Sequence, residues 1–382
     1  MLSEDKRKPE WTPEGAGEEF TTHVMKGVEG GHDGMAVKPA AAASPKPRPR
    51  RRQLSVDDYV QGVLAGDRMI LGRTITLVES NSIAHMDMAQ AVLKQLLPYT
   101  GNSIRIGITG VPGVGKSTFI EAFGCYLLEQ KHKVAVLAVD PTSSLTKGSI
   151  LGDKTRMERL SRETEAFIRP SPTGGMLGGV TRKSRETMLV CEAAGFDVIL
   201  METVGVGQSE TMVRSMVDFF MLLMLAGAGD ELQGIKKGIM ELADTLIINK
   251  ADGDNVMKAK RARAEYNQAI HYLAPATEGW QTKAYICSAL MNTGIPEIWE
   301  VVEKFRQQTA ASGVFEARRR AQMVDWVHTM VEEHLKSSFF NHPGVKAILP
   351  NVESAVADGR LPATTAVKKL LTTFENNREE DK

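Results

Sequence analysis

Seven short runs of apolar residues, separated by segments with helical spacing, constrain the fold of this chain more than any other feature. Each run is apolar throughout rather than alternating with polar residues, which is typical of strands that are buried on both faces. Helical segments between such strands favour right-handed crossovers and a mostly parallel, doubly wound α/β sheet. The runs are "SIRIGIT" (103–109), "KVAVLAVD" (133–140), "AFIRP" (166–170), "DVILME" (197–202), "FFMLLML" (219–225), "TLIINK" (245–250) and "AYICSA" (284–289).

Helical patterns precede the predicted sheet. Ser55 and Asp58 predict a capping box ahead of apolar residues spaced for one helix face, and the helical pattern continues to about Leu97, where Pro98 stops it. The residues before this segment are rich in Gly, Pro, Ala and charge, which is typical of disorder. They end in "SPKPRPRRR", which reads either as a solvated linker or as a basic binding patch.

A further helix is predicted after the last strand, from about Glu316 to Phe340. One face of this helix is apolar, and it must be buried against its own domain or against a second subunit. We call this face the arm stripe; it consists of Met323, Trp326, Val327, Met330, Val331 and Leu335. The predicted division is therefore a disordered tail (1–54), a helical segment (55–100), an α/β domain (101–312) and a helical C-terminal arm (313–382).

The composition excludes several classes of protein. Lys+Arg and Asp+Glu both number 47, so zero net charge gives no reason to expect nucleic acid or an anionic membrane as a partner. The 3 Cys form no CxxC pair, which opposes a disulfide scaffold and favours a reducing compartment. The longest apolar stretch, around 219–228, is too short to span a bilayer. We expect a cytoplasmic protein.

A glycine-rich loop follows the first predicted strand and opens a helix. "GVPGVGKS" (110–117) fits the pattern G-x-x-x-x-G-K-[ST], in which backbone N–H groups and the helix N-terminus surround phosphate. Lys116 can reach the β- and γ-phosphates, and Ser117 can place its hydroxyl on Mg²⁺. The predicted phosphate-binding residues are Gly110, Val111, Pro112, Gly113, Val114, Gly115, Lys116, Ser117 and Thr118.

A second motif indicates which base the nucleotide carries. "NKAD" (249–252) ends a predicted strand, so its side chains emerge at the edge of the sheet where ligands bind. The Asp252 carboxylate can accept two hydrogen bonds from the N1–H and the exocyclic amine of guanine, a donor pair that adenine lacks. Asn249 can brace the loops and Lys250 can cover the base. Ser288, Ala289 and Leu290 follow the next strand, where a backbone N–H can meet the guanine O6.

Carboxylates at the ends of other strands predict the metal site. Glu202 ends "DVILME", and a glycine-rich stretch follows in which Gly205 can sense the γ-phosphate through its N–H. Asp140 ends the second run and can reach the Mg²⁺ shell directly or through water. Asp153 is a candidate for orienting water or metal, or else a solvated loop acid. Gln208 does not directly follow the sensing glycine, so it reads equally as a polar loop residue.

At this point the chain resembles a known family. The segments that carry the resemblance are "GITGVPGVGKST", "AVDPTS", "GSILGDKTRM", "METVGVGQSE", "GAGDELQGIKKGI", "NKAD" and "SALMNTGIPEIWE". Together they resemble the MeaB/ArgK family of P-loop GTPases, which includes the human methylmalonic aciduria type A protein. The resemblance covers roughly residues 55–370. It implies a homodimeric, Mg²⁺-dependent enzyme that hydrolyses GTP to GDP. It also implies a partner, an adenosylcobalamin-dependent acyl-CoA mutase, usually methylmalonyl-CoA mutase, for which the protein gates cofactor loading and protects or reactivates the enzyme.

The resemblance also implies roles for individual residues. Lys116, Asp153 and Glu202 become catalytic, and Ser117, Asp140 and Glu202 become the metal site. The loops around Asp153 and Gly205 become two switches, and "GAGDELQGIKKG" (227–238) becomes a third loop that signals to the mutase. The arm stripe matches the place of the family's dimerisation arm. One departure is Ala226, where the family pattern leads us to expect Pro.

Three other readings compete with this one. A metallochaperone GTPase needs a His-rich tract or a Cys pair near the nucleotide, whereas this chain has 8 scattered His. A kinase or ATPase linked to arginine and ornithine transport, the activity behind the name ArgK, is opposed by the guanine motif. An interaction protein that binds nucleotide without hydrolysing it is separated from the others by a rate measurement.

Overall fold

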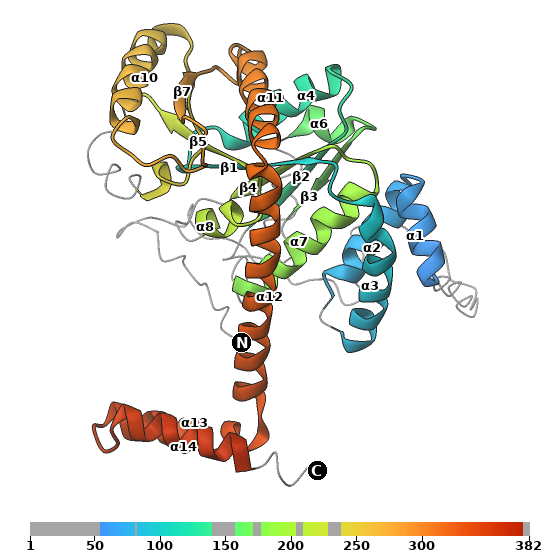
Figure 1. Cartoon of the computed structure of the whole chain (residues 1–382), viewed down its shortest axis with the longest axis vertical. Helices are drawn as coiled ribbons and strands as arrows, with labels where there is room; N and C mark the ends of the chain where they lie inside the picture. Colours follow the sequence, from blue (N-terminus) through green and yellow to red (C-terminus); the bar gives the residue numbers. More distant parts are fainter. Residues whose placement is uncertain are drawn as a thin grey trace, which may run out of the picture. The chain divides into compact units, whose positions relative to one another are not determined.

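The computed structural model confirms the predicted parallel, doubly wound sheet (Figure 1). The strand order is β3-β2-β4-β1-β5-β6-β7, and every neighbouring pair runs parallel. The structure describes residues 54–80, 82–139, 157–170, 177–203, 209–227 and 238–376. The predicted tail (1–54) lies outside the described residues except for its last residue.

The strands match the predicted runs closely. They are β1 (Ile104–Gly110), β2 (Val134–Val139), β3 (Ala166–Arg169), β4 (Val198–Thr203), β5 (Phe219–Leu225), β6 (Thr245–Asn249) and β7 (Lys283–Ile286). Strands β6 and β7 end before the predicted residues for local reasons. Lys250 has a φ of 59°, which a strand does not accommodate. Ser288 pairs with Thr293 in an antiparallel bridge, so the chain turns away after Ile286.

Helices cover both faces of this sheet. The helices of the described residues are α1 (Val56–Leu64), α2 (Arg68–Val78), α3 (Ile83–Leu96), η2 (Leu97–Tyr99), α4 (Lys116–Glu129), α6 (Glu158–Arg162), α7 (Leu177–Ala193), α8 (Ser209–Arg214), η4 (Gly253–Asn255), α10 (Val256–Ile270), α11 (Ile295–Ala311), α12 (Val314–Asn341), α13 (Pro343–Ala357) and α14 (Ala363–Asn376), of which α13 and α14 lie away from the sheet (Figure 1). Apolar side chains of α4, α6 and α11 form one core with the sheet, and those of α1, α2, α3, α7 and α10 form a second core. Because both faces are covered, the strands are mainly apolar, and their polar residues lie at or next to the strand ends.

The N-terminal helical segment belongs to the second core. Tyr59, Val60 and Val63 of α1 are buried there. The predicted capping box is confirmed: the N–H of Asp58 donates to Ser55 Oγ (3.1 Å), and the N–H of Ser55 donates to Asp58 Oδ2 (2.9 Å). The α-helical path ends at Leu96, just before Pro98 as predicted, and a short 3₁₀ turn (Leu97–Tyr99) follows it.

Replacing Ser55 with Ala should lower the free energy of unfolding by about 1 kcal/mol, because the N–H of Asp58 at the start of α1 loses its hydroxyl acceptor. Urea unfolding of the full chain measures the change. Asp58→Ala damages the same box, so the double variant should lose less stability than the sum of the two single variants. Strictly additive losses would show that the box does not act as a unit.

The first turns of α12 are attached to the sheet by two arginines. Arg319 forms a two-pronged ion pair with Asp218 (2.8 and 2.6 Å) and also donates to the carbonyl of Ser103 (2.6 Å). Arg318 donates to the carbonyl of Asp218 (2.5 Å) and lies 3.8 Å from the buried carboxylate of Asp244. Ser103, Asp218 and Asp244 each directly precede a strand, namely β1, β5 and β6. The arm is therefore fixed at the edge where the strands begin.

The rest of α12 leaves the arm stripe exposed. Val327, Val331 and Leu335 are 58%, 52% and 54% exposed, and Met323 and Met330 are also exposed. Trp326 differs from the others, since it is half-buried with the guanidinium of Arg185 lying 5.6 Å from its ring centre. Apolar side chains in these numbers on one helix face are typical of an interface. In the described part of the chain, no helix has the length and apolar character needed to cross a membrane.

Candidate nucleotide site

The glycine loop joins β1 to α4 as predicted. Gly110, Gly113 and Gly115 have φ values of 154°, 78° and 91°, which side chains with a Cβ rarely adopt. A Cβ on Gly110 would lie 2.6 Å from the carbonyl oxygen of Leu223, so the neighbouring strand also requires glycine there. The N–H of Phe119 is bonded to Gly115 O (2.9 Å), which leaves the N–H groups of the preceding helical turn available to an anion.

Lys116 lies at the first position of α4 and its ammonium group folds over the loop. Its Nζ donates to the carbonyl of Gly110 (2.8 Å) and lies 3.5 Å from the carbonyl of Val111. Burial lowers the pKa of Lys116, and the negative charges of Glu202 and Glu210 oppose this shift. The lysine is therefore held inside the loop, in a position from which it can move to a phosphate.

Ser117 and Glu202 lie side by side. The Ser117 hydroxyl donates to Glu202 Oε1 over 3.2 Å, although the two residues come from α4 and the end of β4. In the sheet, Glu202 is in register with Ile108 of β1 and Ala138 of β2, so it sits between the strands that carry the glycine loop and the predicted Asp140. A hydroxyl and a carboxylate are the oxygen ligands that Mg²⁺ accepts, so these residues fit the metal.

Asn249 connects the phosphate loop to the predicted base loop. Its Nδ2 donates to the carbonyl of Val114 (3.0 Å), and its Oδ1 accepts from the N–H of Ala289 (3.1 Å) and from the thiol of Cys287 (3.4 Å). Burial raises the pKa of Cys287 to about 12, so the thiol keeps the proton that it donates. A Cβ on Gly115 would lie 2.9 Å from Asn249 Nδ2, so this close approach also requires glycine.

Asp252 is tied to the second base-recognition segment. The Ser288 hydroxyl donates to Asp252 Oδ2 and accepts from the N–H of Met291 (3.2 Å). Ser288 also exchanges two backbone hydrogen bonds with Thr293 (3.0 and 3.1 Å), which closes a small turn. Leu290 is 75% exposed on this turn. The structure thus brings the residues of "NKAD" and of 288–290 together.

Some of the remaining predicted residues lie within the described part of the chain and others lie outside it. Within the phosphate loop Val114 is buried, Val111 is half-buried, and Pro112 and Thr118 are exposed. Lys250 has a φ of 59°, which turns the chain out of β6. The predicted metal, switch and water-orienting residues Asp140, Asp153, Gly205 and Gln208 lie outside the described residues, as does most of the predicted third loop (227–238).

Sequence reasoning missed two residues of this site. Cys287 supports Asn249 through its thiol, but a buried thiol gives no recognisable signal in one sequence. Glu210 is 5% exposed and its charge affects the pKa of Lys116, although a glycine-rich stretch of sequence separates it from Glu202. Its position in "VGVGQSE", at the start of a helix, was the available signal.

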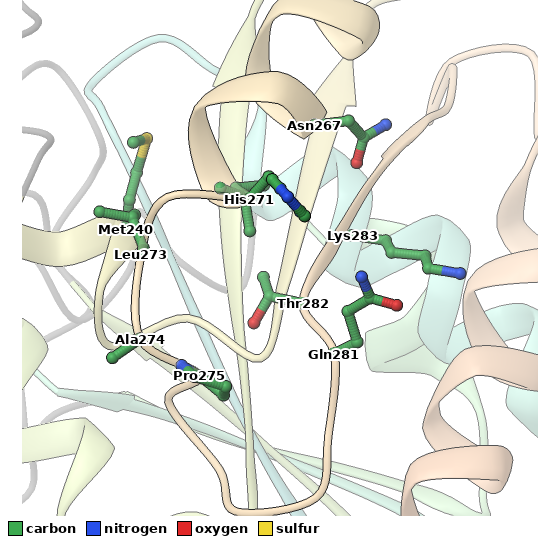
Figure 2. Close-up of a pocket in the computed structure, with 10 residues that line it drawn as sticks. Met240, Asn267, His271, Leu273, Ala274, Pro275, Gln281, Thr282 and Lys283 are labelled. Atoms are coloured by element: carbon green, nitrogen blue, oxygen red, sulfur yellow. The ribbon is translucent and has the colours of Figure 1, made fainter.

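A hollow of about 530 Å³ lies elsewhere, where β7 begins, and not at the ends of β1, β4 and β6 (Figure 2). Figure 2 shows the side chain of Thr282, which belongs to the same segment as Gln281 and Lys283, in the space between that segment and the helix end that carries His271. Its polar groups serve the fold: Thr282 Oγ1 donates to the carbonyl of Ala243 (3.0 Å), and Asn267 Oδ1 accepts from the N–H of Ala284 (2.8 Å). We assign no ligand to this hollow.

Comparison with known proteins identifies the family to which this site belongs. Residues 71–344 match the family model described as methylmalonyl Co-A mutase-associated GTPase MeaB. The chain belongs to the MeaB family. This MeaB-family GTPase is 53% identical over 321 residues to a putative GTPase of Caulobacter vibrioides, covering 84% of this chain and 98% of the relative.

Two further relatives have more specific names. The GTPase ArgK of Escherichia coli is 45% identical over 318 residues, covering 83% of this chain and 96% of the relative. The mitochondrial methylmalonic aciduria type A homolog of Mus musculus is 44% identical over 336 residues, covering 85% and 81%. A solved structure named LAO/AO transport system kinase superposes on this MeaB-family GTPase with a TM-score of 0.68 at 39% identity, covering 84% of this chain and 97% of that one.

Proposed function

We propose that this MeaB-family GTPase is a chaperone of an adenosylcobalamin-dependent acyl-CoA mutase, with methylmalonyl-CoA mutase as the first candidate. It gates cofactor loading and protects or reactivates the mutase. The observation that carries the proposal is the match of residues 71–344 to a family whose description names association with methylmalonyl-CoA mutase. The name of the Mus musculus relative, a methylmalonic aciduria type A homolog, agrees with it.

In this proposal the residues of the site have separate roles toward GTP and Mg²⁺. Lys116 and the N–H groups of residues 110–118 bind the β- and γ-phosphates. Ser117, Glu202 and Asp140 hold Mg²⁺, which offsets phosphate charge when bound. Asp252 and the turn at 288–290 select guanine, while Asn249 keeps that turn at a fixed position relative to the phosphate loop. Asp153 and Gly205 belong to the two switches.

We further propose that the protein is a cytoplasmic homodimer in which 313–382 serve as the dimerisation arm and 101–312 as the GTPase domain. The exposed arm stripe supports the dimer, because leaving three large aliphatic side chains more than half exposed on one helix is unfavourable. All three cysteines are free thiols, which suits a reducing compartment.

The isolated protein should hydrolyse GTP slowly, at about 10⁻² per second or less, and the mutase should accelerate it at least about tenfold. The reason is that the site has neither a Gln directly after the sensing glycine nor an assigned arginine finger, and each contributes orders of magnitude in related enzymes. Phosphate release with and without purified mutase measures both rates. A turnover of tens per second by the isolated protein contradicts this expectation.

The partner itself is tested by affinity capture from source extract, once with GDP and once with a non-hydrolysable GTP analogue. We expect an acyl-CoA mutase, captured in different amounts with the two nucleotides. A Lys116→Ala variant serves as the control, because it should lose the difference between nucleotides. Capture of an amino-acid transport protein instead would favour the kinase reading suggested by the name of the solved relative.

A further inference from the structure

The carboxylate of Glu210 has no explained role in the fold. Glu210 is 5% exposed, and within the described part of the chain its Oε2 is buried without a hydrogen-bond partner. A buried acceptor that lacks a partner destabilises the folded state, and a buried carboxylate does so more strongly than a neutral group. Unpartnered groups of this kind often have a function that opposes stability.

The position of Glu210 shows where that function lies. It belongs to α8, which contacts β1 and β4, the two strands that carry the phosphate loop and Glu202 (Figure 1). In the sequence, only Ser209 separates it from residues 204–208, which include the predicted sensing glycine, Gly205. Its charge and that of Glu202 both act on Lys116. Two buried carboxylates therefore lie near enough to the lysine of the phosphate loop for their charges to act on it.

Four roles for this carboxylate can be compared. A carboxylate cannot donate a hydrogen bond to phosphate and would repel it, so direct phosphate binding is excluded. Lys116 donates to the carbonyl of Gly110, and none of the ion pairs between described residues joins it to Glu210. Glu202 already has the Ser117 hydroxyl beside it as a second oxygen ligand for metal. The remaining role is to accept a hydrogen bond from water.

We propose that Glu210 holds the water molecule that attacks the γ-phosphate, through a hydrogen bond accepted by its free carboxylate oxygen. The water oxygen forms a bond to the γ-phosphorus, and the bond from that phosphorus to the β–γ bridging oxygen breaks. The electron pair of the broken bond stays with GDP, and both protons of the water end on inorganic phosphate, released as H₂PO₄⁻. The proposal rests on the assignment of Lys116 and Glu202 to the nucleotide site, and it is independent of the mutase.

The test uses two variants of the full chain and a matched control. Glu210→Met removes the acceptor at similar volume, while Glu210→Gln keeps an acceptor oxygen without the charge. Glu192 is the control, because it is 6% exposed but fully bonded, by Arg105 (2.8 and 3.0 Å), Ser103 and the N–H of Gly101 (2.9 Å). Glu192→Met should lower the melting temperature, whereas Glu210→Met should raise it by about 2–4 °C in the nucleotide-free protein.

Single-turnover cleavage of bound GTP gives the second readout. Glu210→Met should slow it about 100-fold, and Glu210→Gln should stay within about fivefold of the unaltered protein, since its amide oxygen still accepts a hydrogen bond. Affinities for GDP and for a non-hydrolysable GTP analogue, and the Mg²⁺ concentration at half-maximal binding, should change by less than about threefold.

Each other result overturns the proposal in a distinguishable way. A normal cleavage rate in Glu210→Met shows that the carboxylate does not hold the water. A shifted Mg²⁺ midpoint makes Glu210 a metal ligand, and a lowered melting temperature makes it a structural residue. If Glu210→Gln cleaves GTP as slowly as Glu210→Met, then the negative charge of Glu210 matters through its effect on Lys116, and not through a hydrogen bond to water. If the unaltered protein itself fails to bind GTP, the nucleotide site is wrongly placed and the proposed function falls with it.

Discussion

Asp252→Asn should weaken guanine nucleotide binding by about 2–4 kcal/mol, which is about 30- to 1000-fold in the dissociation constant. The carboxylate accepts from both guanine donors in the proposed complex, and the amide replaces one acceptor oxygen with a donor. Xanthine carries an oxygen where guanine has its amine, so xanthine nucleotides should bind the variant more tightly than they bind the unaltered protein. Fluorescence titration with GDP, ADP and xanthosine diphosphate measures all three affinities.

The structure supplies a matched control for this variant. Asp254 lies two residues further on in η4 and is exposed, so Asp254→Asn makes the same chemical change outside the site. It should leave the three affinities unchanged. Asp252→Asn also changes the acceptor of the hydrogen bond that the Ser288 hydroxyl donates. A Ser288→Ala variant removes this hydrogen bond alone, so it measures how much of the lost guanine affinity comes from it. Equal binding of GDP and ADP by the unaltered protein would mean that the guanine assignment is wrong.

Replacing Val327 and Leu335 together by Asp should convert a dimer into a monomer, with dimer affinity reduced more than about 1000-fold, or about 4 kcal/mol. Both side chains are more than half exposed on the isolated chain, so the change does not disturb the core. Trp326 is a poorer choice, because it packs against Arg185 of α7. Light scattering measures the mass, and GDP binding shows that the GTPase domain remains folded.

The control for the arm uses the same helix. Glu332 and Lys336 are exposed and lie off the arm stripe, so replacing both by Ala should leave the mass unchanged. A Val327→Asp/Leu335→Asp protein that is still dimeric would show that the stripe is covered by something other than a second copy. If the variant loses both dimerisation and GDP binding, the arm and the GTPase domain do not fold independently.

The strands were predictable because their signal is local. A strand buried on both faces has a mainly apolar sequence, and in the seven runs the polar residues lie mostly at or near the ends. The ends of β6 and β7 were less predictable, since they depend on the backbone angle of Lys250 and on the pairing of Ser288 with Thr293. Neither feature leaves a sequence pattern from which it could be predicted, because both depend on the conformation of the loop that follows the strand.

The site was predictable to the extent that its residues lie in short motifs. Lys116, Ser117 and Asp252 were found because their spacing from strands and glycines is itself the signal. The link from Asn249 to Val114 joins residues 135 positions apart and depends on three-dimensional proximity. The burial of Glu210 is a property of how α8 packs on β1 and β4, which sequence spacing does not contain.

The attachment of α12 affects where this chain can be cut. A truncation before Val314 would remove Arg318 and Arg319 and leave the carboxylates of Asp218 and Asp244 buried, with only Arg214 remaining beside Asp244. Breaking a buried pair in this way costs about 3–5 kcal/mol. A cut after Gln322, whose amide also donates to the carbonyl of Val217 (2.9 Å), keeps every one of these contacts. The first turns of the arm helix are thus part of the GTPase domain, and an arm exchanged between relatives should be joined beyond them.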